Sequence, residues 1–390
     1  MVKARRRIGV LGTMANVPYA GMAWMHAQFL IGLTRLGHEV FYVETTTAWP
    51  YHPIELTTTN DPSYALGYID RVMTGFQLGD RWAYRAAYAD GKWYGPLATQ
   101  AVELIQSADA VLNITGSTTP EEIEIPCRLV YVGTDPVLQE LRIAEGDIAL
   151  LKRVGAHKAH FSYGENIGNP DCPVPPLPFP TRPTRQPIII DMWGEGKTPP
   201  RKDFTTVTNW SVEGYDMEYL GEVYTWSKHH EYLKIIDLPK RTTANFEIAL
   251  GLSGVSDEVT RLLRENGWVV VDAFSMSLDP WRYGDYIRNS GSEFSVAKDM
   301  VVRLRSGWFS ERSACYLAAG RPVITQDTAF SNILPTGEGL FAFRTVNEIL
   351  AAIENINADY ERHSRAALEI AQEYFKAEIV LGRMLNDIGL

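Results

Sequence analysis

The chain has few cysteines, no long apolar run and no recognisable export signal. Its three cysteines, Cys127, Cys172 and Cys315, are far apart and match no metal-binding spacing, which predicts free thiols in a reducing compartment. No apolar run approaches the ~20 residues of a membrane-spanning helix. The basic start MVKARRRIGVLG lacks the small-residue cleavage site of a signal peptide. We therefore expect a cytoplasmic protein without a transmembrane segment.

Basic residues are scarce relative to acidic ones. The 390 residues include 47 Asp and Glu against 37 Lys and Arg, for a net charge of -10. Proteins bind a nucleic-acid backbone through a basic face that releases counterions, so this balance argues against a nucleic-acid partner. At ~100–200 residues per domain, the length predicts two or three domains. Nothing in the composition indicates an oligomeric state.

Two common ligand motifs are missing. The first expected strand, 7–11, is followed by Gly12 and Thr13 but not by a complete G-x-G-x-x-G, so the case for a dinucleotide cofactor is weak. Small residues at that place still let a ligand approach the backbone. No D-x-D pattern supplies carboxylates for a divalent cation, and the neighbours His229 and His230 point to different helix faces. We expect no bound cofactor and no metal.

The chain does contain a repeated alternation of strand and helix signals, which is typical of parallel sheets covered by helices. In the first half we expect strands at 7–11, 38–44, 110–114, 128–132 and 159–163, and helices at 22–36 and 97–107. Segment 173–187 carries seven prolines and is typical of a stiff, extended linker. Beyond it we expect strands at 188–192, 246–250, 268–272, 322–325 and 340–343, and helices at 227–236, 257–266, 279–288, 311–319, 346–356 and 359–375.

These elements predict an α/β protein with two Rossmann-like, doubly wound domains. The carboxyl-edge loops of the two domains would face each other across a cleft. We place the N-terminal domain at 1–175, the proline-rich linker at 176–187 and the C-terminal domain at 188–375. A last helix within 376–390 can pack back on the N-terminal domain.

The segment from Ser310 to Phe330, SERSACYLAAGRPVITQDTAF, is the most informative part of the chain. It predicts a helix that begins in a polar, basic turn and ends at Gly320, followed by a short strand and a loop with Asp327. The unpaired N–H groups of a helix N-terminus suit a phosphate. Basic residues just before this helix suggest a diphosphate.

The stretch from Phe294 to Phe343 resembles the donor-binding half of GT-B glycosyltransferases, in particular the group-1 and CgeB-like branch. The segment from Gly9 to Glu44 resembles the opening unit of the same fold, although any doubly wound domain can begin in this way. The features that carry the resemblance are Ser310-Glu311-Arg312, the run Leu317 to Ile324, Asp327 and the turn Gly337 to Leu340.

The resemblance implies a nucleoside-diphosphate sugar held by the C-terminal domain and an acceptor held by the N-terminal domain. Lys298, Arg303 and Arg305 become candidates for the diphosphate, because an Arg fork suits paired phosphate oxygens. Their alternative is a solvated basic strand. Lys228 is a further cation that could reach a phosphate.

The helix start supplies further candidates. Ser310, Arg312 and Ser313 can bind the donor or simply form an N-cap and first turn. Glu311 resembles the acidic residue that group-1 enzymes place near the donor. A second Glu is expected further along that helix, but Ala318 or Ala319 stands there, which tells against a simple retaining group-1 mechanism.

Four more residues are candidates on chemical grounds. Gln326 and Asp327 can hydrogen-bond the donor sugar's hydroxyls, although Asp327 could equally form an Asx turn. His26, near the first turn of the N-terminal domain, is a candidate general base, with an interior structural histidine as its alternative. Asp135, in the loop after an expected strand, is the competing base, although Asp-Pro is also a turn signal.

These observations predict a metal-independent glycosyltransferase whose partners are a nucleotide-sugar donor and a small-molecule or glycan acceptor. Two alternatives stay open. A nucleotide-sugar epimerase with the same fold would need several acid and base carboxylates in the cleft. A non-catalytic nucleotide or sugar binder is favoured by the missing second Glu, and the fold alone does not exclude it.

Overall fold

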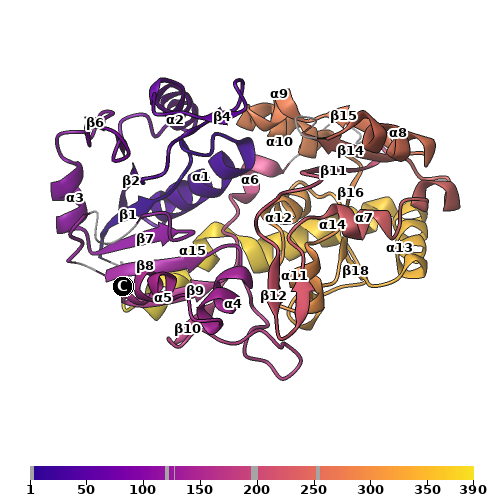
Figure 1. Ribbon diagram of the computed structural model, residues 1–390. Helices are drawn as coiled ribbons and strands as arrows, with labels where there is room; N and C mark the ends of the chain where they lie inside the picture. The colour runs from indigo at the N-terminus through magenta and orange to yellow at the C-terminus, as the bar shows by residue number, and fades with distance from the viewer. Residues whose placement is uncertain (1–3, 119–122, 127, 195–200, 252–254) are drawn as a thin grey trace.

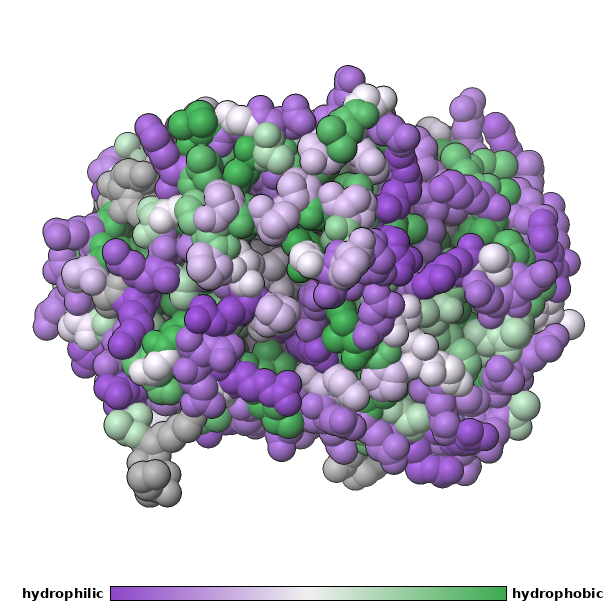
Figure 2. Space-filling view, turned by 90° about the horizontal axis from the view of Figure 1, so that it is seen from below, coloured by the Kyte–Doolittle hydropathy of each residue, from purple (hydrophilic) through white to green (hydrophobic). Residues whose placement is uncertain are grey.

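The computed structural model describes residues 4–118, 123–126, 128–194, 201–251 and 255–390. Two mainly parallel sheets flanked by helices lie side by side in this part of the chain (Figure 1). Within it, no helix is long and apolar enough to cross a bilayer. On the side where β10, α4 and β12 lie, hydrophilic side chains break the apolar surface into small, separate areas (Figure 2).

The N-terminal sheet has eight strands in the order β10-β9-β8-β7-β1-β2-β5-β6, and every neighbouring pair is parallel except β5–β6. Without the two outermost strands, the sequence order is 3-2-1-4-5-6, that of a doubly wound sheet. The order reverses between β1 and β7. The strands are β1 (Arg7–Leu11), β2 (Glu39–Thr45), β5 (Trp82–Arg85), β6 (Trp93–Tyr94), β7 (Ala110–Ile114), β8 (Arg128–Gly133), β9 (Ala159–Ser162) and β10 (Thr181–Pro183).

The C-terminal sheet repeats this arrangement. Its six strands are all parallel, in the order β15-β14-β11-β16-β17-β18, which is again 3-2-1-4-5-6. Here the order reverses between β11 and β16. The strands are β11 (Phe204–Thr208), β14 (Phe246–Leu250), β15 (Val269–Asp272), β16 (Ser292–Ser295), β17 (Val323–Gln326) and β18 (Leu340–Phe343). The predicted α/β class with two Rossmann-like domains is confirmed.

Local sequence explains where several helices begin and end. Asp279 caps the helix that starts at Pro280, and Thr345 and Glu348 form a capping box. Gly320, at φ +66°, follows the helix 311–318. The helices are α1 (Ala20–Arg35), α2 (Ser63–Gly75), α3 (Ala101–Ser107), α4 (Leu138–Ala144), α5 (Ile148–Gly155), α6 (Ile190–Trp193), α7 (His229–Leu233), α8 (Asp257–Glu265), α9 (Phe274–Ser277), α10 (Pro280–Asn289), α11 (Asp299–Arg303), α12 (Glu311–Ala318), α13 (Val346–Ala358), α14 (Tyr360–Ile370) and α15 (Ala377–Asp387).

Two small antiparallel hairpins lie outside the two main sheets. One joins β3 (Tyr51–His52) to β4 (Thr57–Thr58) in the N-terminal domain. The other joins β12 (Met217–Tyr219) to β13 (Glu222–Tyr224) and is inserted between β11 and α7. The second hairpin leads directly into the candidate site.

The domain connections differ from the expected free linker. The proline-rich segment contributes β10, which pairs with β9 at the edge of the N-terminal sheet, a place where proline is tolerated. The strand expected at 188–192 is wrong, because α6 occupies most of that segment. Ile188 instead lies beside the second connection between the domains, near Phe375. The Ile188 N–H donates to Phe375 O at 2.7 Å, and the Ile188 carbonyl accepts from the Ala377 N–H at 2.9 Å. Both connections between the domains therefore lie side by side.

The last helix, α15, packs against α1 of the N-terminal domain (Figure 1). The two helices are so close at Gly32 that an added Cβ would lie 2.6 Å from a Leu381 methyl and 2.8 Å from the Ala377 Cβ. The chain thus ends on the domain with which it began.

The hydrophobic core continues from one domain into the other. Trp24 of α1 lies against Trp193, with ring centroids 4.3 Å apart, and its indole N–H donates to Pro280 O at 2.7 Å. Tyr283 and Phe309 belong to the same buried cluster. This packing fixes the angle at which the carboxyl edges of the sheets meet.

Candidate functional site

Ligands of doubly wound sheets bind outside the carboxyl ends of the strands, where the strand order reverses. We call the region between the ends of β11 and β16 the C-terminal crevice, and the region between the ends of β1 and β7 the N-terminal crevice.

Arg312, in the first turn of α12, bridges the two strands of the C-terminal crevice. Its Nε donates to Glu293 Oε1 at 2.6 Å, one terminal nitrogen donates to Val207 O at 2.7 Å and the other to Ser295 Oγ at 2.6 Å. Glu293 is fully buried and its second oxygen has no partner within the described residues. All three guanidinium nitrogens of Arg312 therefore donate to the protein. The sequence had suggested direct contact with a ligand as one possibility.

Lys228 stands at the start of α7, and its side chain makes no hydrogen bond or ion pair within the described residues. Burial lowers its pKa well below the usual lysine value, and the nearby charges of Arg312 and Lys298 lower it further. Glu293 and Asp135 oppose this shift. The residue is partly exposed, so Lys228 offers an unpaired amine to a ligand.

Lys298, three residues after β16, forms an ion pair with Asp135 of the other domain. Its Nζ lies 2.7 Å from both carboxylate oxygens and 3.2 Å from the centre of the Trp226 ring. Burial lowers the pKa of Lys298, and Asp135 counteracts that effect. The lysine side chain is 13% exposed and the aspartate 43%, so the carboxylate is the more accessible partner.

The loop that carries Asp135 is held in an unusual shape. Val137 has φ +91°, which is rare for a β-branched residue. It is fully buried, and its N–H donates to Glu140 at 2.7 Å. From the other domain, the Trp308 indole donates to Thr134 O at 3.1 Å. These contacts fix the direction in which Asp135 points.

The side chains at the start of α12 have different surroundings. Ser310 is the N-cap without a side-chain capping bond, and the buried Ser313 hydroxyl has no partner in the described chain. Glu311 accepts a hydrogen bond from Gln28 of α1 at 2.8 Å. Gln28 in turn accepts from Ile189 and Trp193. Burial raises the pKa of Glu311 to about 8.

Gln326, the last residue of β17, and Asp327, which follows it, have different surroundings. Gln326 donates to Glu231 at 2.7 Å and accepts from the Ala297 N–H, close to Lys298. Asp327 is an Asx-turn residue, because it accepts from the Ala329 N–H at 2.9 Å and is paired with Arg344 at 2.6 Å. Its carboxylate is thus occupied by the protein.

Arg303 and Arg305 do not join Lys228 and Lys298, contrary to the diphosphate role expected for them. Arg303 pairs with Glu222 and stacks on Tyr224, with its guanidinium carbon 4.3 Å from the ring centre. Arg305 pairs with Asp171 at 2.6 Å. Both side chains thus pair with carboxylates that lie far away in the sequence.

The N-terminal crevice is filled by its own side chains. His26 is fully buried, its Nδ1 lies 2.7 Å from Met22 O and its Nε2 accepts from the Thr13 N–H at 3.3 Å. Burial lowers its pKa to about 4, so the ring is neutral. A Cβ on Gly12 would lie 2.2 Å from this ring. His26 is therefore a structural histidine here, and Gly12 makes room for it rather than for a ligand.

Sequence reasoning missed Glu44, Glu293, Trp226 and Trp308. Glu44 accepts from the Ala15 and Asn16 N–H groups and fixes the loop after β1. Burial raises its pKa to about 7. A lone carboxylate within a buried strand was the available signal for both glutamates.

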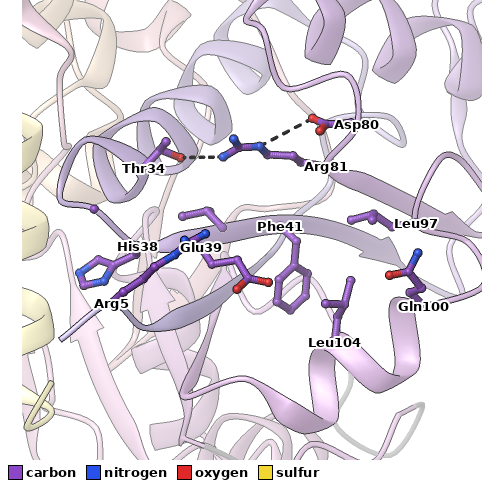
Figure 3. Close-up of a pocket in the computed structure, with 12 residues that line it drawn as sticks. Arg5, Thr34, His38, Glu39, Phe41, Asp80, Arg81, Leu97, Gln100 and Leu104 are labelled. Carbon is purple, nitrogen blue, oxygen red and sulfur yellow. Dashed lines mark hydrogen bonds and ion pairs between the residues drawn. The ribbon is translucent and has the colours of Figure 1, made fainter.

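One cavity of about 500 Å³ lies elsewhere, at the amino ends of β1 and β2. Figure 3 shows Arg81 reaching toward Thr34 and Asp80 above the apolar side chains of Phe41 and Leu104. Since the crevices lie at the opposite, carboxyl edge of the sheets, this cavity is separate from the charged site.

The cysteines and the possible metal ligands do not extend this site within the described residues. Cys172 and Cys315 are buried free thiols, whereas Cys127 lies outside the described residues. No group of three possible metal ligands occurs in the described ranges. The expected independence of metals stays a prediction.

Comparison with known proteins shows the fold. No protein-family model and no curated protein sequence matches the chain. Among solved structures, an alpha-glucosyltransferase in complex with UDP and a 13-mer DNA matches with a TM-score of 0.60 and 11% identity over 99% of this chain and 100% of that one.

Two further matches agree. The Anabaena protein HepE in complex with UDP and glucose has a TM-score of 0.57 and 12% identity, over 99% of this chain and 100% of HepE. Sucrose-phosphate synthase from Thermosynechococcus elongatus has a TM-score of 0.54 and 10% identity, over 98% and 99%. The chain therefore has the GT-B fold of glycosyltransferases, as expected. The CgeB-like branch stays a prediction.

Proposed function

We propose that this GT-B-fold chain is a glycosyltransferase that moves a sugar from a nucleoside-diphosphate sugar to a hydroxyl of a small-molecule or glycan acceptor. The observation that carries the proposal is the unpaired cation of Lys228 in the C-terminal crevice, beside Lys298 and opposite Asp135. UDP-sugars are the first donors to test, because two of the structural neighbours are complexes with UDP.

The two lysines suit the departing diphosphate. As the glycosidic bond breaks, negative charge grows on the leaving phosphate, and preorganised cations stabilise that charge. Lys228 needs no partner to be removed before it can bind a phosphate oxygen. The Ser310 end of α12 adds backbone N–H groups and the buried Ser313 hydroxyl. Arg312 acts through position, by holding β11 and β16 together under the site.

Asp135 is the group that we assign as general base. It belongs to the N-terminal, acceptor-binding domain, and its carboxylate is exposed and faces the C-terminal cations. In the transfer it would take the proton of the acceptor hydroxyl as that oxygen bonds to the sugar carbon. His26 is unsuited to this role, because both of its ring nitrogens are engaged.

Transfer is proposed to be metal-independent, since Lys228 and Lys298 supply the positive charge near the phosphates. The measured transfer rate should then be the same with EDTA as with added Mg²⁺. A loss of more than tenfold on chelation, restored by Mg²⁺, would contradict this part of the proposal.

Calorimetric titration with UDP, GDP, dTDP and ADP tests the donor site directly. We expect one nucleotide to bind the wild type, and Lys228→Met to bind it at least tenfold more weakly. Arg303→Met is the matched control, since it removes the same charge from the same domain but outside the crevice, and should bind within twofold of the wild type. If no nucleotide binds at millimolar concentration, the proposed function is wrong.

Turnover separates an enzyme from a binding protein. A chain that binds a nucleotide should also release it from the corresponding nucleotide-sugar when a suitable acceptor is added. Binding without release across broad acceptor panels would favour the non-catalytic alternative.

A further inference from the structure

The Asp135–Lys298 ion pair places an anion of the protein where a ligand anion is needed. Lys298 follows β16 at the C-terminal crevice, and Asp135 follows β8 at the facing edge of the other sheet. Both carboxylate oxygens are 2.7 Å from the ammonium. A diphosphate that used Lys298 would have to compete with this carboxylate.

The surroundings favour this competition over a merely structural bridge. The Trp226 ring covers one side of the Lys298 ammonium at 3.2 Å, so the carboxylate and a ligand would approach from the remaining side. Lys228 stays unpaired nearby, although Asp135 is close enough to affect its pKa. The pair therefore leaves one cation free to attract the ligand and masks the other.

The backbone of the Asp135 loop indicates that the position of the Asp135 carboxylate beside Lys298 is specifically maintained. A β-branched residue with positive φ costs on the order of 1–3 kcal/mol and persists only where its surroundings impose it. Val137 is held at φ +91° by burial and by the bond to Glu140. Such strain is typical of functional loops.

We propose that Asp135 is an internal competitor of the donor: it holds Lys298 while the site is empty, and the donor diphosphate displaces it. This inference rests on the proposed function. The displaced carboxylate then becomes free to accept the proton of the acceptor hydroxyl. The base is thereby masked until a donor has bound, so that proton transfer waits for the donor.

The Asp135–Lys298 pair should raise the apparent Kd of the donor by a measurable factor. A ligand that binds only the unpaired form has an apparent Kd equal to the intrinsic Kd divided by the fraction of unpaired molecules. If the pair is formed in about nine molecules of ten, removing Asp135 should tighten binding about tenfold.

The test is calorimetric titration of the full chain with the nucleoside diphosphate alone, UDP first, so that no turnover occurs. Asp135→Asn and Asp135→Ala should both bind at least fivefold more tightly than the wild type. Asp171→Asn is the matched control, because Asp171 also pairs with an arginine of the other domain, Arg305, and loses the same charge. It should bind within twofold of the wild type.

The outcomes separate the inference from the proposed function. Suppose that the wild type binds the nucleotide and Lys228→Met does not. Equal or weaker binding by both Asp135 variants then overturns the inference alone. If the wild type binds none of the four nucleoside diphosphates, both fail. Tighter nucleotide binding combined with lost sugar transfer is the expected pattern, and a purely structural role would not produce it.

Discussion

In the N-terminal crevice, His26 fills the space over Gly12, and Glu44 holds the loop after β1 through two backbone N–H groups. In the C-terminal crevice, with the same strand order, Lys228 has no partner in the described chain, and neither do the Ser313 hydroxyl and one Glu293 oxygen. Strand order sets where a ligand could lie. The polar groups that the protein leaves unsatisfied indicate which of the two places is ready to bind one.

The largest expected effect comes from breaking the C-terminal crevice at Arg312. Arg312→Met leaves the carboxylate of Glu293 buried without a counter-charge, which should lower the free energy of unfolding by about 3–5 kcal/mol. Urea denaturation measures this change. Arg362→Met removes an exposed pair with Glu338 and should cost less than about 1 kcal/mol. Similar losses in both variants would show that Arg312 does not organise the crevice.

The second effect comes from overfilling the N-terminal crevice. In Gly12→Ala the new methyl group would meet the His26 ring at 2.2 Å, which should cost about 1–3 kcal/mol in unfolding free energy. Gly21→Ala is the control: nothing lies within 4 Å of its Cβ position on α1, so helix propensity should stabilise the protein by about 0.5–1 kcal/mol. A stabilising Gly12→Ala would mean that this crevice has room for a ligand after all.

The third effect depends on pH and concerns the carboxyl that α12 turns away from the crevice. The pKa of Glu311 is about 8 in the folded chain, against a usual value of 4.5. Between these values the folded state keeps a proton that the unfolded state has lost, so the stability contributed by this group falls as pH rises. Glu311→Gln should match the wild type near pH 4.5 and exceed it increasingly as the pH rises to 8.5.

Thermal unfolding across this pH range measures the difference. Glu338→Gln provides the opposite sign, since the hydrogen bond from Arg362 lowers the pKa of Glu338 and its loss should destabilise the chain at neutral pH. A Glu311→Gln variant whose advantage did not grow with pH would place the Glu311 carboxyl in water.

The smallest effect should follow Arg305→Met. Its pair with Asp171 is about one-third exposed, and such pairs contribute about 0–1 kcal/mol. Nucleotide affinity should stay within twofold of the wild type. A tenfold loss of affinity would return Arg305 to the donor site and shift the charged crevice toward α11.

Much of the fold could be predicted, because the strand and helix periods of a parallel sheet are local. The error at 188–192 arose because a short apolar run does not distinguish a strand from a helical turn. The site was harder to predict. Lys298 and Lys228 lie at the crevice, but the directions of Arg303, Arg305 and Arg312 depend on carboxylates distant in sequence. The partner of Lys298 is 163 residues away.

The packing of α15 on α1 has a consequence for how the protein is made. The groove beside Gly32 that receives Leu381 and Ala377 cannot be filled until α15 has left the ribosome. That moment comes roughly 200 residues after β10, which at ~5–20 residues per second means a delay on the order of 10–40 s. During this interval the first sheet emerges with one face of α1 bare. The second domain is thus completed before α15 closes the first one.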